Sequence, residues 1–108
     1  MPSTTIARGN SLSTFYIAPS LTPVAVAAQV SPAQTFNIAG LQTTDIIVVV
    51  GYNGTQTSGI IIAEADCLTA GVLSIQFGNL TTGSLTPAAG VYSIQIVRAE
   101  GPLPVTAV

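Results

Sequence analysis

The stretch GVLSIQF, residues 71–77, recurs further along the chain as GVYSIQI, residues 90–96. Apolar and polar residues alternate in both copies, which predicts a β-strand that turns one face toward a core. Three apolar side chains share that face in each copy: Leu73, Ile75 and Phe77 in the first, and Tyr92, Ile94 and Ile96 in the second. We therefore interpret the repeat as two structural strands rather than as part of a working site.

Strand-like composition extends over most of the chain. Valine, isoleucine and threonine crowd short apolar stretches that are separated by glycine or proline, which is typical of β-structure. The pattern predicts strands at residues 23–28, 35–38, 45–51, 59–65, 72–77 and 91–98, with a further one near 14–18. Residues 78–90 form a connection longer than the roughly 2–5 residues of a hairpin loop, so we expect the chain to cross between two sheets there. The predicted fold class is all-β: a single β-sandwich or jelly-roll-like domain.

The two ends of the chain differ from its middle. Residues 1–22 are rich in serine and threonine and show little periodicity, and residues 99–108 contain two prolines that exclude a central strand. We expect an N-terminal arm at 1–22, a β-sandwich domain at 23–98 and a C-terminal extended tail at 99–108. Because both ends carry several apolar residues, we expect them to dock on this domain or on a neighbouring subunit.

Two apolar runs in the middle of the chain do not alternate. They are DIIVVVG at residues 45–51 and GIIIAEA at residues 59–65. Runs of this kind are typical of strands buried on both faces, whereas a two-layer sandwich of this size has only one core. The second face therefore needs another cover, and the simplest one is a second copy of the chain. We predict a homo-oligomer, with a trimer favoured over a dimer.

Composition excludes several classes of function. The 108 residues fit one domain and carry two arginines, no lysine and four acidic residues, for a net charge of −2. This balance argues against nucleic-acid partners and against electrostatic binding to acidic lipid. The mean hydropathy is +0.65, but no apolar run approaches the ~20 residues of a membrane-spanning helix. The first residues also lack the apolar stretch of a signal peptide, so export by that route is not expected.

Side chains for chemistry are scarce. The chain has no histidine, and its one cysteine, Cys67, is expected to be a small buried apolar side chain. Catalytic triads, zinc sites and a P-loop lysine are therefore excluded. Glu64 and Asp66 share a strand face and could in principle serve glycoside hydrolysis or calcium binding. We favour a strand end that turns into solvent for this pair, and a turn residue for Asp45. We expect no catalytic, cofactor-binding or metal-binding residues, and no enzymatic activity.

Three further residues invite a functional reading. Asn53 and Asn79 each begin an Asn-x-Thr glycosylation pattern, yet both lie beside glycines in expected turns, which explains them without a sugar. Tyr52 is either an exposed binding aromatic or a packed one. A sugar-binding or adhesin-type β-sandwich would need such aromatics to gather at one end, and only three tyrosines are available: Tyr16, Tyr52 and Tyr92.

Two stretches of the chain form a recurring pattern: TFNIAGLQTTDIIVVV, residues 35–50, and LTAGVLSIQFGNLTTGSLTPAAGVYSIQIVR, residues 68–98. Through this pattern, residues 34–98 resemble a family of small structural proteins of tailed bacteriophages. The matching positions are Thr35, Phe36, Ile38, Gly40, Leu41, Asp45, Phe77, Asn79, Thr81, Gly83, Leu85, Pro87, Ala88, Gly90, Tyr92 and Arg98. These are scaffold positions, so the resemblance transfers no catalytic residue.

The resemblance implies a virion structural protein. Capsid decoration or cement is the role that fits best, with the major capsid protein as partner. The expected location is the outer capsid surface, after synthesis in the cytoplasm of a bacterial host. A tail-associated position and the sugar-binding module are the alternatives.

Overall fold

The structure, a computed structural model, describes residues 11–99. Seven strands make up the fold: β1 (Ser11–Ile17), β2 (Ser20–Leu21), β3 (Ala33–Asn37), β4 (Asp45–Tyr52), β5 (Ile60–Thr69), β6 (Val72–Asn79) and β7 (Gly90–Ala99). Between residues 11 and 99 there is no helix. The predicted all-β class is therefore confirmed, whereas the jelly-roll topology stays a prediction.

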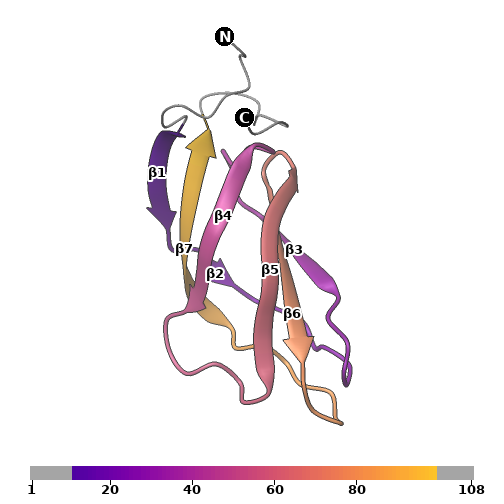
Figure 1. The fold of residues 1–108 in the computed structure, drawn as a ribbon. Coiled ribbons are helices and arrows are strands. Elements are labelled where there is room, and N and C mark those ends of the chain that lie inside the picture. Colours follow the sequence, from indigo (N-terminus) through magenta and orange to yellow (C-terminus); the bar gives the residue numbers. More distant parts are fainter. Residues whose placement is uncertain (1–10, 100–108) are drawn as a thin grey trace, which may run out of the picture.

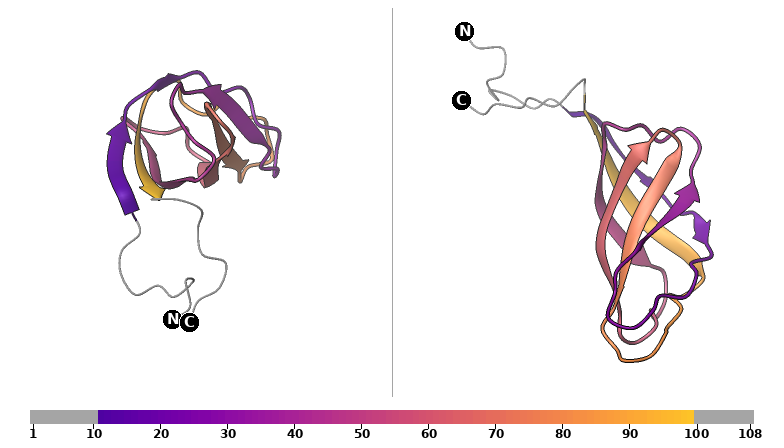
Figure 2. Two further views of the ribbon diagram at one scale, coloured as in Figure 1. Left: turned by 90° about the horizontal axis from the view of Figure 1, so that it is seen from above. Right: turned by 90° about the vertical axis from the view of Figure 1, so that its right-hand side faces the viewer.

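The strands form two antiparallel sheets that face each other (Figures 1 and 2). In one sheet β7 is central, with β1 and β2 paired one after the other along one edge and β4 along the other edge. In the second sheet β6 is central, between β3 and β5. The chain passes from β6 to β7 through residues 80–89, so it changes sheet at the connection where the sequence predicts a crossing.

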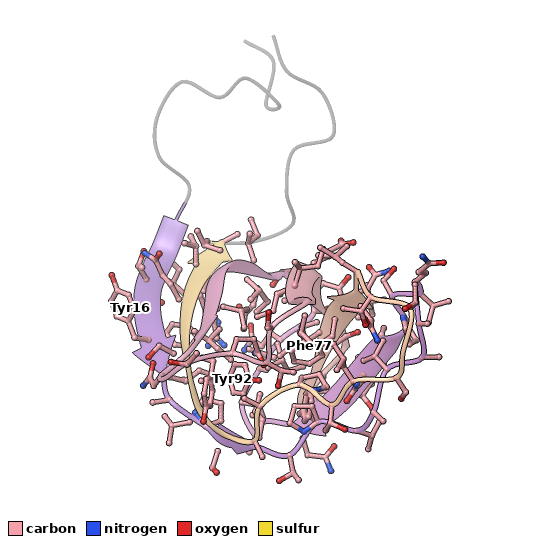
Figure 3. The ribbon with its side chains drawn as sticks, turned by 90° about the horizontal axis from the view of Figure 1, so that it is seen from below. Tyr16, Phe77 and Tyr92 are labelled. Atoms are coloured by element: carbon pink, nitrogen blue, oxygen red, sulfur yellow. The ribbon has the colours of Figure 1, made fainter. Side chains whose placement is uncertain are left out.

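The repeated sequence explains why these two strands are central. GVLSIQF enters β6 and GVYSIQI forms most of β7, so each copy is the middle strand of one sheet. All six alternating apolar side chains are at most 1% exposed: Leu73, Ile75, Phe77, Tyr92, Ile94 and Ile96. The Phe77 and Tyr92 rings meet edge to face with centroids 6.2 Å apart, and both point into the space between the sheets (Figure 3). Full burial of such a side chain stabilises the fold by about 1.5–3 kcal/mol.

One predicted strand is wrong. Residues 23–28 form a single bridge instead of a strand, in which Val26 and Leu85 exchange two backbone hydrogen bonds of 2.7 and 3.1 Å. Pro23 has no N–H to give to a ladder. At Val24 the side-chain amide of Gln34 replaces a neighbouring strand, because it accepts from Val24 N at 2.8 Å and donates to Val24 O at 2.9 Å. The segment is held in place by these contacts and by the fully buried side chain of Val26.

The N-terminal part of the described chain belongs to the sheet. β1 lies inside the range 1–22 that we expected as an arm, and it pairs with β7 from Ser11, opposite Ala99, to Ile17, opposite Ile94. Its Phe15 and Ile17 side chains pack against the core, whereas Tyr16 is 73% exposed and points outward (Figure 3). Residues 1–10 and 100–108, where the outer parts of both expected arms fall, lie outside the described residues.

Candidate interaction surface

A groove lies between β4 and β5. These strands run side by side at the front of Figure 1 and are joined by residues 53–59, yet they do not pair through backbone hydrogen bonds. The space between them, about 530 Å³, is lined by Ile47, Val48 and Val50 and by residues 62–65. Each sheet therefore presents an unpaired edge to this groove.

Two β-bulges explain why the edges stay apart. The register of β4 against β7 shifts between Ile47 and Val49, and that of β5 against β6 shifts between Ile62 and Glu64. Val48 and Ala63 are thus the extra residues, and both line the groove. A bulge bends its strand and disrupts a regular ladder, which is a common way of protecting an edge. The sequence predicts neither bulge, because the apolar runs that contain them do not alternate.

The outer side of both strands is apolar and exposed. Ile46, Val48 and Ile61 are 44%, 51% and 44% exposed. The second face that the apolar runs lead us to expect is thus open to solvent in the single chain, and what covers it stays a prediction. A second groove of about 330 Å³ adjoins the first at Ala63 and reaches the exposed side chains of Val30 and Leu80.

We call this surface the β4–β5 face, and define it by six residues: Val30, Ile46, Val48, Ile61, Ala63 and Leu80. Glu64 is the one charged side chain that lines either of its two grooves. Exposed apolar side chains that border two grooves in this way are typical of a protein-interaction site.

Glu64 and Asp66 lie close together on β5. Both line a shallow depression of about 100 Å³ with Ser74 and Gln76 of β6, and Oδ1 of Asp66 is buried there without a hydrogen-bond partner. They stand inside β5, so the expected strand end is wrong; Glu64 is exposed, as expected, whereas Asp66 is half-buried. Within residues 11–99, no group of three or more His, Cys, Asp or Glu side chains could hold a metal ion.

Asp45 is a structural anchor rather than only a turn residue. Its buried carboxylate accepts from Nε and Nη2 of Arg98 at 2.8 and 2.7 Å, and from the backbone N–H of Gln42 at 2.9 Å. The hydrogen bonds from Arg98 hold the pKa of Asp45 below its ordinary value, against the opposing effect of burial. Arg98 also donates to Gly40 O and lies over the ring of Phe15. Sequence reasoning missed this pair because its members are far apart in the chain.

Two of the three tyrosines are packed and bonded inside the fold. Tyr92 donates from its hydroxyl to Ala88 O at 2.6 Å and accepts from Gln56 Nε2 at 3.1 Å. Burial raises the pKa of Tyr92. Tyr52 stacks at a tilt on Tyr92, 5.1 Å between centroids, and donates to Ala89 O. Tyr16 lies apart on β1, so the tyrosines do not gather into a sugar-binding platform (Figure 3).

Asn79 organises the crossing between the sheets. Its side chain is buried; Nδ2 donates to Val26 O at 3.0 Å and to Gly83 O at 2.8 Å, and Oδ1 accepts from N and Oγ1 of Thr81. The Asn-x-Thr pattern at this position is therefore a turn motif whose amide nitrogen is engaged by the protein. At the other pattern, Ser93 Oγ donates to Asn53 Oδ1 at 2.6 Å.

The one cysteine of the chain lies in the core. Cys67 is a free, buried thiol that donates to Thr69 O, as expected for a small core residue. No helix among the described residues is long and apolar enough to cross a membrane.

Comparison of the chain with models of known families, with curated proteins and with solved structures finds no match.

Proposed function

We propose that this chain is a non-enzymatic virion structural protein, which decorates the outside of a tailed-phage head and cements its shell. The observation that carries the proposal is the β4–β5 face, an apolar surface with a single charged side chain at its grooves. A cement protein must hold shell subunits together through a rigid body, and it needs no active site. The sequence resemblance over residues 34–98 supports the same role.

The proposed partners are the major capsid protein and further copies of this chain. Copies would associate through the β4–β5 face, with a trimer favoured over a dimer. A standard interface buries about 1,600 Å² in total, so one copy must contribute more than the six residues of the face. The arms are the proposed source of the additional contact area.

The experiment is decoration of purified heads from a phage that lacks the gene for this chain. The full-length protein is added, the particles are sedimented, and the bound fraction is measured and imaged. Ile61→Asp, on the face, should lower occupancy strongly, whereas Leu12→Asp, at an exposed position of β1, should not. Labelling of tails alone, or binding to a glycan array without binding to heads, would refute the proposal.

A further inference from the structure

The groove between β4 and β5 has the features of a site for an extended apolar segment. Two strand edges flank it, and they do not pair with each other. A segment laid in the groove could pair with one of these edges and press its side chains on Ile47 and Ile62. Glu64 is its one charged lining residue, so the groove disfavours an acidic occupant.

The chain itself contains such a segment. Residues 102–108, PLPVTAV, follow β7 closely and carry no charged side chain. In an extended conformation Leu103, Val105 and Ala107 share one face. Pro102 and Pro104 remove N–H groups from one edge only, since successive residues direct their N–H groups to opposite sides. The other edge keeps its N–H groups, so the segment can pair on one side, as an edge strand does.

The exit point of the segment indicates whose groove it reaches. β7 ends beside the start of β4, because Arg98 pairs with Asp45. The groove begins at Ile47, two residues further along β4, so the chain would have to reverse sharply after Ala99 to enter its own groove. Pro104 disfavours a reversal at residues 101–104, because Leu103, the residue before it, is biased toward extended conformations. Residues 100–108 can reach about 30 Å when extended, at roughly 3.3 Å per residue, which is far enough to meet a neighbour.

The N-terminal segment fits the groove less well. Residues 1–10, MPSTTIARGN, include Arg8 and several polar side chains. They lead into β1, which lies on the opposite edge of β7 from β4. The C-terminal segment is therefore the better match in apolar pattern and in place.

We propose that residues 102–108 of one copy bind in the β4–β5 groove of a neighbouring copy, as an exchanged edge strand with Leu103, Val105 and Ala107 facing inward. This inference rests on the proposed homo-oligomer and names the contact that builds it. It assigns the groove to a second copy of this chain, and leaves the rest of the β4–β5 face for direct contact between bodies.

Disulfide trapping between differently tagged copies tests the contact. All chains carry Cys67→Ala, whose fold and oligomeric state are checked first. One population carries Ala63→Cys and the other Val105→Cys; they are mixed during refolding and oxidised. Docking should raise the local concentration of the thiols into the millimolar range, so at micromolar protein we expect mixed dimers at least about tenfold faster than for a control pair with Thr14→Cys in place of Ala63→Cys. Thr106→Cys, on the outward face of the segment, should also react more slowly than Val105→Cys.

Each alternative to the exchanged tail predicts a different result in the disulfide trapping. A single chain with both Ala63→Cys and Val105→Cys that closes only an internal disulfide would overturn the exchange, because the segment would then fill its own groove. Mixed dimers at the rate of the control pair would overturn it as well. If light scattering still showed oligomers in that case, the proposed self-association would stand and only the tail contact would fall.

Discussion

Replacing Asn79 should reveal how strongly one buried amide stabilises the crossing between the two sheets. The side chain is 2% exposed and takes part in four hydrogen bonds: to Val26 O, to Gly83 O, and from N and Oγ1 of Thr81. A net contribution of about 0.5–1.5 kcal/mol per bond predicts that Asn79→Ala lowers the free energy of unfolding by about 2–4 kcal/mol. Two of the partners keep another hydrogen bond after the substitution: Val26 O still accepts from Leu85 N, and Thr81 Oγ1 still donates to Gly83 O. The total loss of unfolding free energy should therefore not exceed about 4 kcal/mol.

Asn79→Asp makes the same site sensitive to pH. The introduced carboxyl group would face two carbonyl oxygens in a buried place, and both effects raise its pKa in the folded state. A raised folded-state pKa means that the folded chain holds the proton more tightly than the unfolded chain. The variant should therefore be most stable below pH ~4, near the unfolded pKa of an aspartate, and should lose stability as pH rises through the folded-state pKa.

Urea unfolding followed by far-UV circular dichroism is the assay, since the chain has no tryptophan. A loss of 2–4 kcal/mol corresponds to a midpoint about 1–2 M lower, for a urea slope of about 2 kcal/mol per M. Asn79→Ala serves as the control without a titrating group. The reasoning is refuted if Asn79→Ala moves the midpoint by less than about 0.3 M, or if Asn79→Asp gains stability between pH 4 and 7.

Three further predictions concern charge and assembly. The pKa of Asp45 is lowered in the folded state, so its carboxylate adds stability above pH 3.8, its ordinary pKa, and this stability is lost as pH falls through the folded-state pKa. Asp45→Asn should therefore reduce the fall of the urea midpoint at low pH, measured from pH 2.5 to 7. Ile61→Asp should shift the purified protein toward monomer in light scattering at an unchanged folded fraction, whereas Leu12→Asp should leave assembly intact; equal effects of both would count against the β4–β5 face. Decoration of heads should change little up to ~0.5 M NaCl, because screening weakens charge contacts and not apolar ones; a steep loss in a sedimentation series would contradict apolar attachment.

The sequence predicts the centre of this fold better than its edges. The alternation in residues 71–77 and 90–96 identifies β6 and β7, because each strand turns one face to the core. The strands that pair with β6 and β7 on either side leave this alternation of buried side chains unchanged. Residues 23–28 mislead, because their apolar content reflects two buried residues, Pro23 and Val26, and not a ladder. The side chain of Gln34 forms the hydrogen bonds that a neighbouring strand would form there, and no local sequence pattern predicts this contact.

The candidate surface could be predicted only in outline. Non-alternating runs at 45–51 and 59–65 correctly mark strands with a second apolar face, which the structure exposes at Ile46, Val48 and Ile61. The groove itself depends on where the two bulges fall, and in a run of similar residues nothing specifies that position. The Asp45–Arg98 pair was missed for a related reason, since it forms only when β4 and β7 are already in register.

The placement of charge in the body connects its stability to its surface. Four charged side chains fall within the described residues: Asp45, Glu64, Asp66 and Arg98. Two of them neutralise each other in the ion pair at the start of β4, and the other two lie together on β5. Most of the exterior therefore has no charge with which to repel another copy or to attract a charged partner. A body of this kind gains more from covering its β4–β5 face than from leaving it in water, because apolar burial contributes about 25 cal/mol per Å² and no strong charge opposes it. The same low charge that argues against nucleic acid as a partner thus suits the proposed association with apolar surfaces, a shell or a further copy of the chain.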